Sequence, residues 1–314
     1  MRCDHCERPA VVDQPYRGSH VCDRHFRESV TERVRREMHR QVPGFSGGTI
    51  AVALSGGKDS AVALLLTQRY FARRPNVRLV ALSVDEGVAG YRAGTLRSAR
   101  ELTERFGVEH RTVRARDALG VTTDATLAML PGVAPCSYCG VWRRGLLNRA
   151  AREVGADLLV LGFNLDDLAQ TVLMNLARAD LDRLARMAPH RHRQPGLVPR
   201  IAPLAQIPER EVFLYARLSG IPFDHAECPH AGPAARNVFR EVVWRLEEEL
   251  PGTRQALLRT QAALAPLLAP GGGEGSPGRC VECGEPASGA RCRSCAYLER
   301  VRNSLVAEPA SGPT

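Results

Sequence analysis

The sequence predicts an α/β protein with a doubly wound parallel sheet, flanked by N- and C-terminal metal-binding modules. Three observations lead to this prediction. Short apolar runs alternate with helical patterns through the middle of the 314-residue chain. A glycine-rich loop follows the first of these runs. Two groups of closely spaced cysteine and histidine residues stand near the two ends of the chain.

Hydrophobic periodicity predicts the central elements. Residues 49–54 form a short, apolar, β-branched run, which is typical of a buried parallel strand. Ligands of such sheets bind beyond the carboxyl ends of the strands, so motifs that follow strands are the candidate site. Further strands are expected at 77–84 and 157–163, and helices at 59–70, 93–106, 138–154 and 166–178.

The overall composition is that of an ordinary globular protein, with 25% charged and 44% hydrophobic residues. No apolar run approaches the roughly 20 residues that span a bilayer, and the N-terminus shows no apolar signal region. We therefore expect a cytoplasmic protein whose ten cysteines bind metal or react. The net charge of +9 indicates a polyanionic partner.

One lysine stands out among the cations. Lysine and arginine together number 43, and Lys58 is the single lysine. A compact ammonium and a planar guanidinium serve differently at a phosphate site. Lys58 is therefore a candidate for a position that arginine cannot fill.

Lys58 lies in the loop SGGKDS, residues 55–60, between the first expected strand and its helix. Adjacent glycines let the backbone approach an anion, and the amides at the helix start attract phosphate. Ser55 and Ser60 add hydroxyl groups. The loop is not a Walker motif, because the GxxxxGK spacing is absent. A glycine-rich turn with an incidental lysine is the simpler alternative.

Two further segments follow expected strands. Residues 83–87 read SVDEG and contain Asp85, and residues 162–167 read GFNLDD. The carboxylates of Asp166 and Asp167 suit Mg²⁺, which prefers hard oxygen ligands beside phosphates. Alternatively, the two aspartates cap the helix that follows them.

The terminal cysteines have the spacing of zinc ligands. Each group offers two close pairs, which suits a closed tetrahedral Zn²⁺ site. A redox or disulfide role is the alternative, and we expect His5 and His20 to be bystanders. The expected ligands are Cys3, Cys6, Cys22 and His25 for the first zinc, and Cys280, Cys283, Cys292 and Cys295 for the second.

Cys136, Cys139 and Cys228 form a separate set. The first two precede an expected helix, whose N-terminus lowers the pKa of a thiol. Three cysteines suit a [4Fe–4S] cluster with one iron left open, or a nucleophile with its resolving partner. A purely structural CxxC is the third interpretation.

These motifs together resemble a known family. The SGGKDS loop is similar to that of the PP-loop ATP pyrophosphatases, the adenine nucleotide α-hydrolase-like fold. The chain as a whole resembles the TtuA family of tRNA 2-thiouridine synthetases. The motifs that carry this resemblance, besides the loop, are PCSYC at 135–139, the lone Cys228, both terminal modules, the segment 164–175 and PGT at 251–253. It is also similar to the archaeal and eukaryotic wobble-uridine thiolases. The likeness covers about residues 1–300.

The resemblance implies ATP, Mg²⁺, two Zn²⁺ and a [4Fe–4S] cluster held by the three central cysteines, with Asp167 near the reacting centre. It implies tRNA as partner, a sulfur donor that is a ubiquitin-like thiocarboxylate protein or sulfide, and a homodimer. The family often has Gly-His-Asn where residues 162–164 read Gly-Phe-Asn, which removes any polar role of that histidine. The expected nucleotide contacts are Ala53, Ser55, Gly56, Gly57, Lys58, Asp59, Ser60, Asp85, Arg143 and Gly162.

The preferred function is ATP-dependent 2-thiolation of the T-loop uridine at tRNA position 54, with the wobble uridine second. The alternatives are another adenylating activity and, from a different class, a non-catalytic zinc-ribbon RNA-binding protein. Basic segments at 33–40 and 190–193 are expected to contact RNA, or else to be solvated faces. The expected parts are a zinc finger (1–30), a connecting helix (31–42), the PP-loop domain (43–265), a linker (266–279), a zinc ribbon (280–300) and a tail (301–314).

Overall fold

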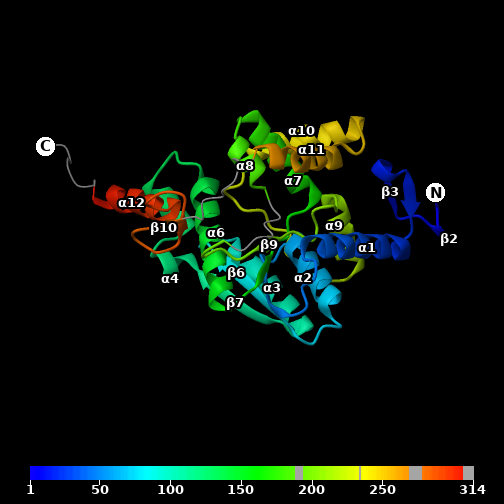
Figure 1. Cartoon of the computed structure of the whole chain (residues 1–314), viewed down its shortest axis with the longest axis horizontal. Helices are drawn as coiled ribbons and strands as arrows, with labels where there is room; N and C mark the ends of the chain where they lie inside the picture. The colour runs from blue at the N-terminus through cyan, green and yellow to red at the C-terminus, as the bar shows by residue number, and fades with distance from the viewer. Residues whose placement is uncertain (188–193, 233–234, 269–277, 307–314) are drawn as a thin grey trace.

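A computed structural model of the chain describes residues 1–187, 194–232, 235–268 and 278–306 (Figure 1). The segment 190–193, expected to contact RNA, lies outside these residues. The central sheet has five parallel strands in the order β7-β6-β5-β8-β9. The chain moves outwards from β5 in both directions, so the sheet is doubly wound as predicted, and its switch point lies between β5 and β8. The strands are β5 (Gly48–Ala53), β6 (Val77–Asp85), β7 (Glu109–Arg114), β8 (Leu158–Val160) and β9 (Arg200–Ile201).

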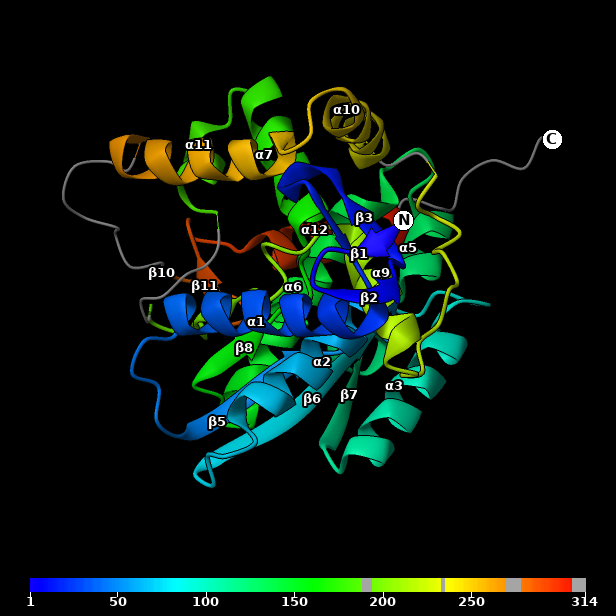
Figure 2. The ribbon, with the colours of Figure 1, turned by 90° about the vertical axis from the view of Figure 1, so that its right-hand side faces the viewer.

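Helices cover both faces of this sheet (Figure 2). Ile50 and Val52 point to one face, where the core includes residues of α1 (Asp23–Gln41), α2 (Lys58–Phe71), α3 (Arg92–Phe106) and α9 (Glu209–Leu218). Ala51 and Leu159 point to the other face and pack against α6 (Pro135–Glu153). A further group of helices packs on α7: α8 (Leu181–Ala185), α10 (Arg236–Glu249) and α11 (Thr253–Leu268), with α7 itself at Leu165–Ala177.

Every strand and helix predicted from periodicity is present. The strand expected at 157–163 is shorter, because its last residues leave the sheet and turn towards the site. Strands β7 and β9 and helices α9 to α12 were not predicted. β7 carries mostly polar side chains at the edge of the sheet, and β9 has only two residues, so neither gives a periodic signal.

The N-terminal module is continuous with the body of the protein. Its hairpins are β1 (Arg2–Cys3) with β2 (Cys6–Pro9), and β3 (Val12–Gln14) with β4 (Ser19–Val21), the latter pair joined by a short 3-10 turn. Helix α1 then begins at Asp23, well before the connecting helix expected at 31–42. It is anchored by buried apolar side chains and by an ion pair between Arg33 and Glu211 of α9.

The C-terminal module lies at the opposite end of the molecule from the N-terminal one (Figure 1). It contains β10 (Gly278–Arg279), β11 (Pro286–Ala287) and α12 (Arg293–Val306). Helix α12 extends past residue 300, where the zinc ribbon was expected to end, because Val301 is buried against α6 and Tyr297 stacks on Tyr138 at 4.0 Å. Within the described residues, no helix is long and apolar enough to cross a membrane.

Candidate functional site

The predicted phosphate loop connects β5 to α2 at the carboxyl edge of the sheet. Gly56 has φ +90°, and a Cβ there would lie 1.9 Å from the carbonyl oxygen of Thr95, so only glycine fits. The Ser60 hydroxyl donates to the Gly57 carbonyl at 2.9 Å and accepts from the Ser55 amide at 3.1 Å. These bonds close the loop around the start of α2, where backbone amides favour an anion.

A buried ion pair that was not predicted from the sequence stabilises the phosphate loop. Glu86 and Arg92 are both almost fully buried, and Arg92 Nε lies 2.8 Å from Glu86 Oε2. The Arg92 guanidinium also donates to the carbonyl oxygens of Ser55, at 3.1 Å, and Val84. The other oxygen of Glu86 lies 3.4 Å from Arg143, one of the expected nucleotide contacts. Glu86 therefore joins the phosphate loop to helix α6.

Lys58 lies between two carboxylates. Its Nζ is 2.9 Å from Asp59 Oδ2 and 2.8 Å from Glu209 Oε1, and the side chain is only 21% exposed. Burial alone lowers the pKa of Lys58, but the two carboxylates outweigh it and raise the pKa, so the ammonium is charged. Glu209 was not predicted; the only signal in the sequence is an acidic residue after Pro208 at a helix start.

The end of β8 is pressed against the start of α2. A Cβ on Gly162 would lie 3.0 Å from the amide nitrogen of Ser60, which explains the glycine. Asn164 caps α7 in a reciprocal capping box with Asp167 and donates from Nδ2 to Asp59 Oδ1 at 3.0 Å. Asp59 and Asp167 thus converge beside Lys58, where two carboxylates suit Mg²⁺.

The two neighbouring aspartates of α7 differ in role. Burial, reinforced by the charge of Asp59, raises the pKa of Asp167 to about 6. Asp166 instead pairs with Arg254 at 3.1 Å and accepts from the Glu209 amide at 2.8 Å. Asp166 therefore fixes the start of α9. The sequence predicted Mg²⁺ at both aspartates, and we now expect only Asp167 to bind it.

Other predicted nucleotide contacts line the same edge. Ala53 ends β5, and Asp85 ends β6, where its carboxylate accepts from the Gly87 amide at 3.0 Å. Phe163, which replaces the histidine common in the resembled family, is 43% exposed beside Gly162 and Asn164. The expected site residues of the loop and the two strand ends are therefore brought together.

The central cysteines lie next to this edge. Cys136 and Cys139 are in the first turns of α6, which starts at Pro135, earlier than predicted, because proline suits the first helical position. The loop that carries Cys228 is held by His230, which pairs with Asp124 of α5 (Thr123–Met129) at 2.7 Å. Cys139 lies close to Thr123, the first residue of α5, and to Cys228 in this loop.

The environment of Cys139 differs from the sequence-based expectation. Burial raises the pKa of Cys139, with Glu86 and Cys228 adding to the rise, and Arg143 only partly opposes it. The prediction of a thiol pKa lowered by the helix N-terminus is therefore wrong for Cys139. The same interactions place Cys139 close to Cys228 on one side and to the Glu86–Arg143 pair on the other.

The terminal modules form the two metal-competent groups found within the described residues, with all ligand atoms of each group within 4.8 Å of one another. A tetrahedral zinc with Zn–S bonds near 2.3 Å places its sulfurs about 3.8 Å apart. Cys6 and Cys22 are 3.8 Å apart, and Cys283 and Cys292 are 3.6 Å apart. His5 and His20 lie outside both groups, and all ten cysteines are free of disulfides.

The three central cysteines do not form such a tight group in the described structure. In an iron–sulfur cluster each cysteine binds a different iron, so the ligand sulfurs lie farther apart than around one ion. A site for a single tetrahedral ion is therefore not preformed at Cys136, Cys139 and Cys228.

The fold and loop define a PP-loop protein, and residues 30–247 match the PP-loop domain family. The chain is 39% identical to the tRNA 2-thiolation protein NcsA of Haloferax volcanii, covering 96% of this chain and 99% of the relative. It is 31% identical to the tRNA-5-methyluridine(54) 2-sulfurtransferase of Pyrococcus horikoshii, covering 95% and 93%.

A solved structure agrees with these matches. The U34-tRNA thiolase NcsA from Methanococcus maripaludis, with its [4Fe-4S] cluster, superposes with a TM-score of 0.81 at 31% identity over 96% of both chains. The chain therefore belongs to the PP-loop family of tRNA 2-thiolation proteins, as the sequence motifs predicted.

The raised pKa of Asp167 predicts a pH-dependent stability change in Asp167→Asn. Ionising Asp167 costs the folded state nothing below about pH 4, where folded and unfolded chains are both protonated. The cost builds up between the unfolded pKa of about 3.9 and the folded pKa of about 6 and is fully present above it. Asparagine keeps an oxygen for the capping box without the charge. Urea unfolding of the nucleotide-free protein in EDTA should therefore show a gain of about 1–3 kcal/mol at pH 7.5 and roughly a third of that gain at pH 4.5.

The matched control is Asp117→Asn, which removes an exposed carboxylate and should change stability little at either pH. An equal gain for Asp167→Asn at both pH values would contradict the burial argument.

Proposed function

We propose that this protein is an ATP-dependent tRNA sulfurtransferase that replaces the C2 oxygen of a uridine with sulfur. One observation carries the proposal. The phosphate loop with Lys58 and the cysteine pair of α6 are linked by the buried carboxylate of Glu86, through Arg92 and Arg143. A nucleotide-activating group and a sulfur-handling group therefore share one edge of the sheet.

The first chemical step makes the uridine oxygen a leaving group. O2 of the uridine attacks the α-phosphorus of ATP, an O–P bond forms, and the bond to the β-phosphate breaks to release pyrophosphate. The amides at the start of α2 and the ammonium of Lys58 are placed to neutralise the departing charge. Asp59 and Asp167 would hold Mg²⁺ against the phosphates.

The second step replaces the activated oxygen. A sulfide sulfur attacks C2, and the C2–O bond breaks to release AMP. Cys136, Cys139 and Cys228 would hold a [4Fe–4S] cluster, which supplies an iron free of protein ligands for the incoming sulfur. Positioning supplies most of the catalysis, because the two steps together require three reactants, the uridine, ATP and sulfide, to be aligned in one site.

The terminal groups would each hold a Zn²⁺ and stabilise modules too small to fold by burial alone. We propose the six-part organisation described above, with helix α1 shared between the first two parts and α12 extending the last ribbon. A sulfur donor, either a ubiquitin-like thiocarboxylate protein or sulfide, and a homodimer in the cytoplasm complete the proposal. The rival non-catalytic RNA-binding role would not require the central cysteines.

The comparisons bear on which uridine is modified. The relative with 39% identity and the superposed structure share the name NcsA, and the structure is a U34-tRNA thiolase. We therefore propose the wobble uridine as the target. The T-loop uridine, favoured by the sequence motifs alone, stays as a second candidate, supported by the 31% identical position-54 enzyme.

Nucleoside mass spectrometry of tRNA from a deletion strain tests the function. We expect a 2-thio nucleoside to be lost, and mapping of the digested tRNA to place the loss at the wobble position. A loss confined to position 54 would select the second candidate. An unchanged profile at both positions would refute the sulfurtransferase proposal.

Anaerobic reconstitution with iron and sulfide tests the cluster ligands. The wild-type protein should show a broad absorption shoulder near ~400 nm, as expected for cysteine-ligated clusters. The triple variant Cys136→Ala, Cys139→Ala, Cys228→Ala should lack it while keeping its zinc content. A triple variant that still assembles a full cluster would disprove the assignment.

Lys58→Arg tests the loop chemistry. Nζ fits between two carboxylates, whereas a planar guanidinium is longer and needs a wider space. We expect the variant to bind tRNA normally and to lose at least tenfold in ATP-dependent thiolation, since each 1.4 kcal/mol of lost transition-state stabilisation costs about tenfold in rate. Near-normal turnover of Lys58→Arg would mean that the lysine has no special role.

A further inference from the structure

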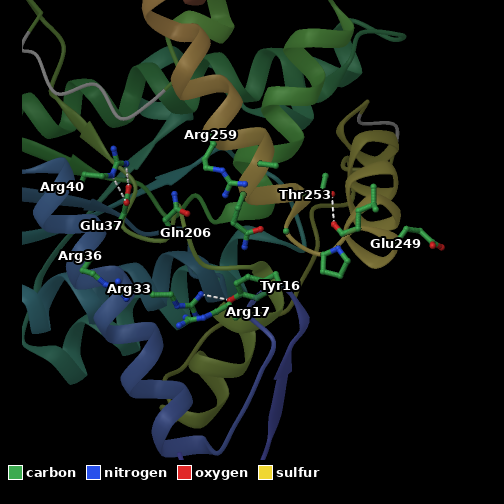
Figure 3. Close-up of a pocket in the computed structure, with 15 residues that line it drawn as sticks. Tyr16, Arg17, Arg33, Arg36, Glu37, Arg40, Gln206, Glu249, Thr253 and Arg259 are labelled. Carbon is green, nitrogen blue, oxygen red and sulfur yellow. Dashed lines mark hydrogen bonds and ion pairs between the residues drawn. The ribbon is translucent and has the colours of Figure 1, made fainter. Parts of the chain in front are cut away.

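Two cavities of this protein are lined by arginine, and their charges are balanced differently. The α1 cavity, of about 980 Å³, lies between α1 and the start of α11 (Figure 3). The α6 cavity, of about 430 Å³, lies between α6 and the C-terminal cysteine module. Nearly all basic residues of this protein are arginines, so an arginine in a cavity does not by itself indicate a binding site. What a cavity can bind depends on whether each guanidinium group already has a partner in the chain.

In the α1 cavity most guanidinium groups already have a carboxylate. Arg33 pairs with Glu211, Arg36 lies 3.6 Å from Glu32, and Arg40 pairs with Glu37. Figure 3 shows Arg40 held by Glu37, and Arg33 donating to the hydroxyl of Tyr16. This cavity is therefore largely neutralised from within the chain.

The α6 cavity has the opposite character. Its lining includes four arginines and one carboxylate, Glu285. Glu285 pairs with Arg149 at 3.4 Å and also with Arg152. Among the described residues, no hydrogen bond or ion pair engages the guanidinium groups of Arg144, Arg200 or Arg293. Unpaired like charges around one cavity repel one another and favour an anion.

The environment of two of these arginines agrees with this view. The packing around Arg144, and then the positive charges of Arg143 and Arg200, lower the pKa of Arg144, although its side chain is exposed. Burial also lowers the pKa of Arg200, which is partly exposed. Both guanidinium groups can therefore be reached by an anion.

A buried tryptophan also lines the cavity. Trp142 is only 2% exposed, and its indole Nε1 is a buried donor without an acceptor within the described structure. Because this nitrogen is itself covered by protein atoms, an anion in the cavity does not reach it, and Trp142 serves only as a reporter of the cavity.

The cysteine module accounts for only part of the charge. A Cys₄ zinc centre would carry a charge of about −2, and Arg293 lies next to Cys292 in sequence. Arg144 and Arg200 belong to α6 and β9, on the sheet side of the cavity. The argument therefore depends on Arg144 and Arg200.

We propose that the α6 cavity binds a phosphodiester group of the RNA substrate, through Arg144 and Arg200. The inference rests on the proposed function, since it names the part of the tRNA that this cavity takes. Arg144 follows Cys139 by five residues on α6, about 7.5 Å along the helix axis. A phosphate held there anchors the RNA strand beside the cysteines.

Equilibrium binding of substrate tRNA to the full-length, metal-loaded protein tests the proposal. The double variant Arg144→Gln, Arg200→Gln should bind roughly tenfold more weakly at 0.15 M salt. Its slope of log K against log salt should fall by about 1, because one phosphate contact is lost. The matched control Arg78→Gln, Arg111→Gln removes the same charge from arginines paired with Glu109 and should bind within about twofold of wild type.

Tryptophan emission gives a second readout. The protein has two tryptophans, so Trp244→Phe leaves Trp142 as the single reporter. Its emission should change on adding tRNA, and this change should disappear when Arg144→Gln and Arg200→Gln are added. Zinc content measured on every variant checks that the module is intact.

Three outcomes would overturn the proposal. These are equal weakening in the control variant, an unchanged dissociation constant and salt slope in the double variant, or a raised KM for ATP with tRNA binding intact. The last result would assign the cavity to a nucleotide phosphate. Failure of the proposed function is a different result, because it appears as an unchanged nucleoside profile in the deletion strain.

Discussion

The buried carboxylate of Glu86 is the interaction on which the site depends. It holds Arg92, which fixes the phosphate loop through the Ser55 carbonyl, and it reaches Arg143 on the helix that begins with the cysteines. Buried ion pairs contribute little net stability, but loss of one partner leaves an uncompensated charge that costs about 3–5 kcal/mol. The pair therefore acts mainly to hold two loops and a helix in one arrangement.

This arrangement has a chemical reason. Activation of the carbonyl oxygen and delivery of sulfur must occur at the same carbon atom. The phosphate loop and the central cysteines therefore have to be close enough to act on the same uridine. The doubly wound sheet provides this by bringing the ends of β5 and β8 together at its switch point, with α6 beside them. Gly162 and Asn164 then press the β8 end onto the phosphate loop.

Much of this was predictable from the sequence, and the exceptions share one cause. The SGGKDS loop, the metal ligands and the main strands and helices are local patterns, and the structure places them as expected. Glu86, Arg92 and Glu209 were missed, because each acts through partners that are distant in the sequence. The raised pKa of Cys139 was missed for the same reason, since burial by the surrounding chain outweighs the local effect of the helix N-terminus.

Charge in this protein is informative through its pairing rather than its amount. An arginine-rich composition places guanidinium groups on every face, and most of those with structural roles lie against carboxylates, as Arg33 lies against Glu211. Two places stand out from this background. At the phosphate loop a compact lysine, Lys58, fits between Asp59 and Glu209. At the α6 cavity Arg144 and Arg200 have no partner among the described residues. The proposed chemistry requires a phosphate at both places, one of ATP and one of RNA, so the net charge of +9 is informative mainly through these two places.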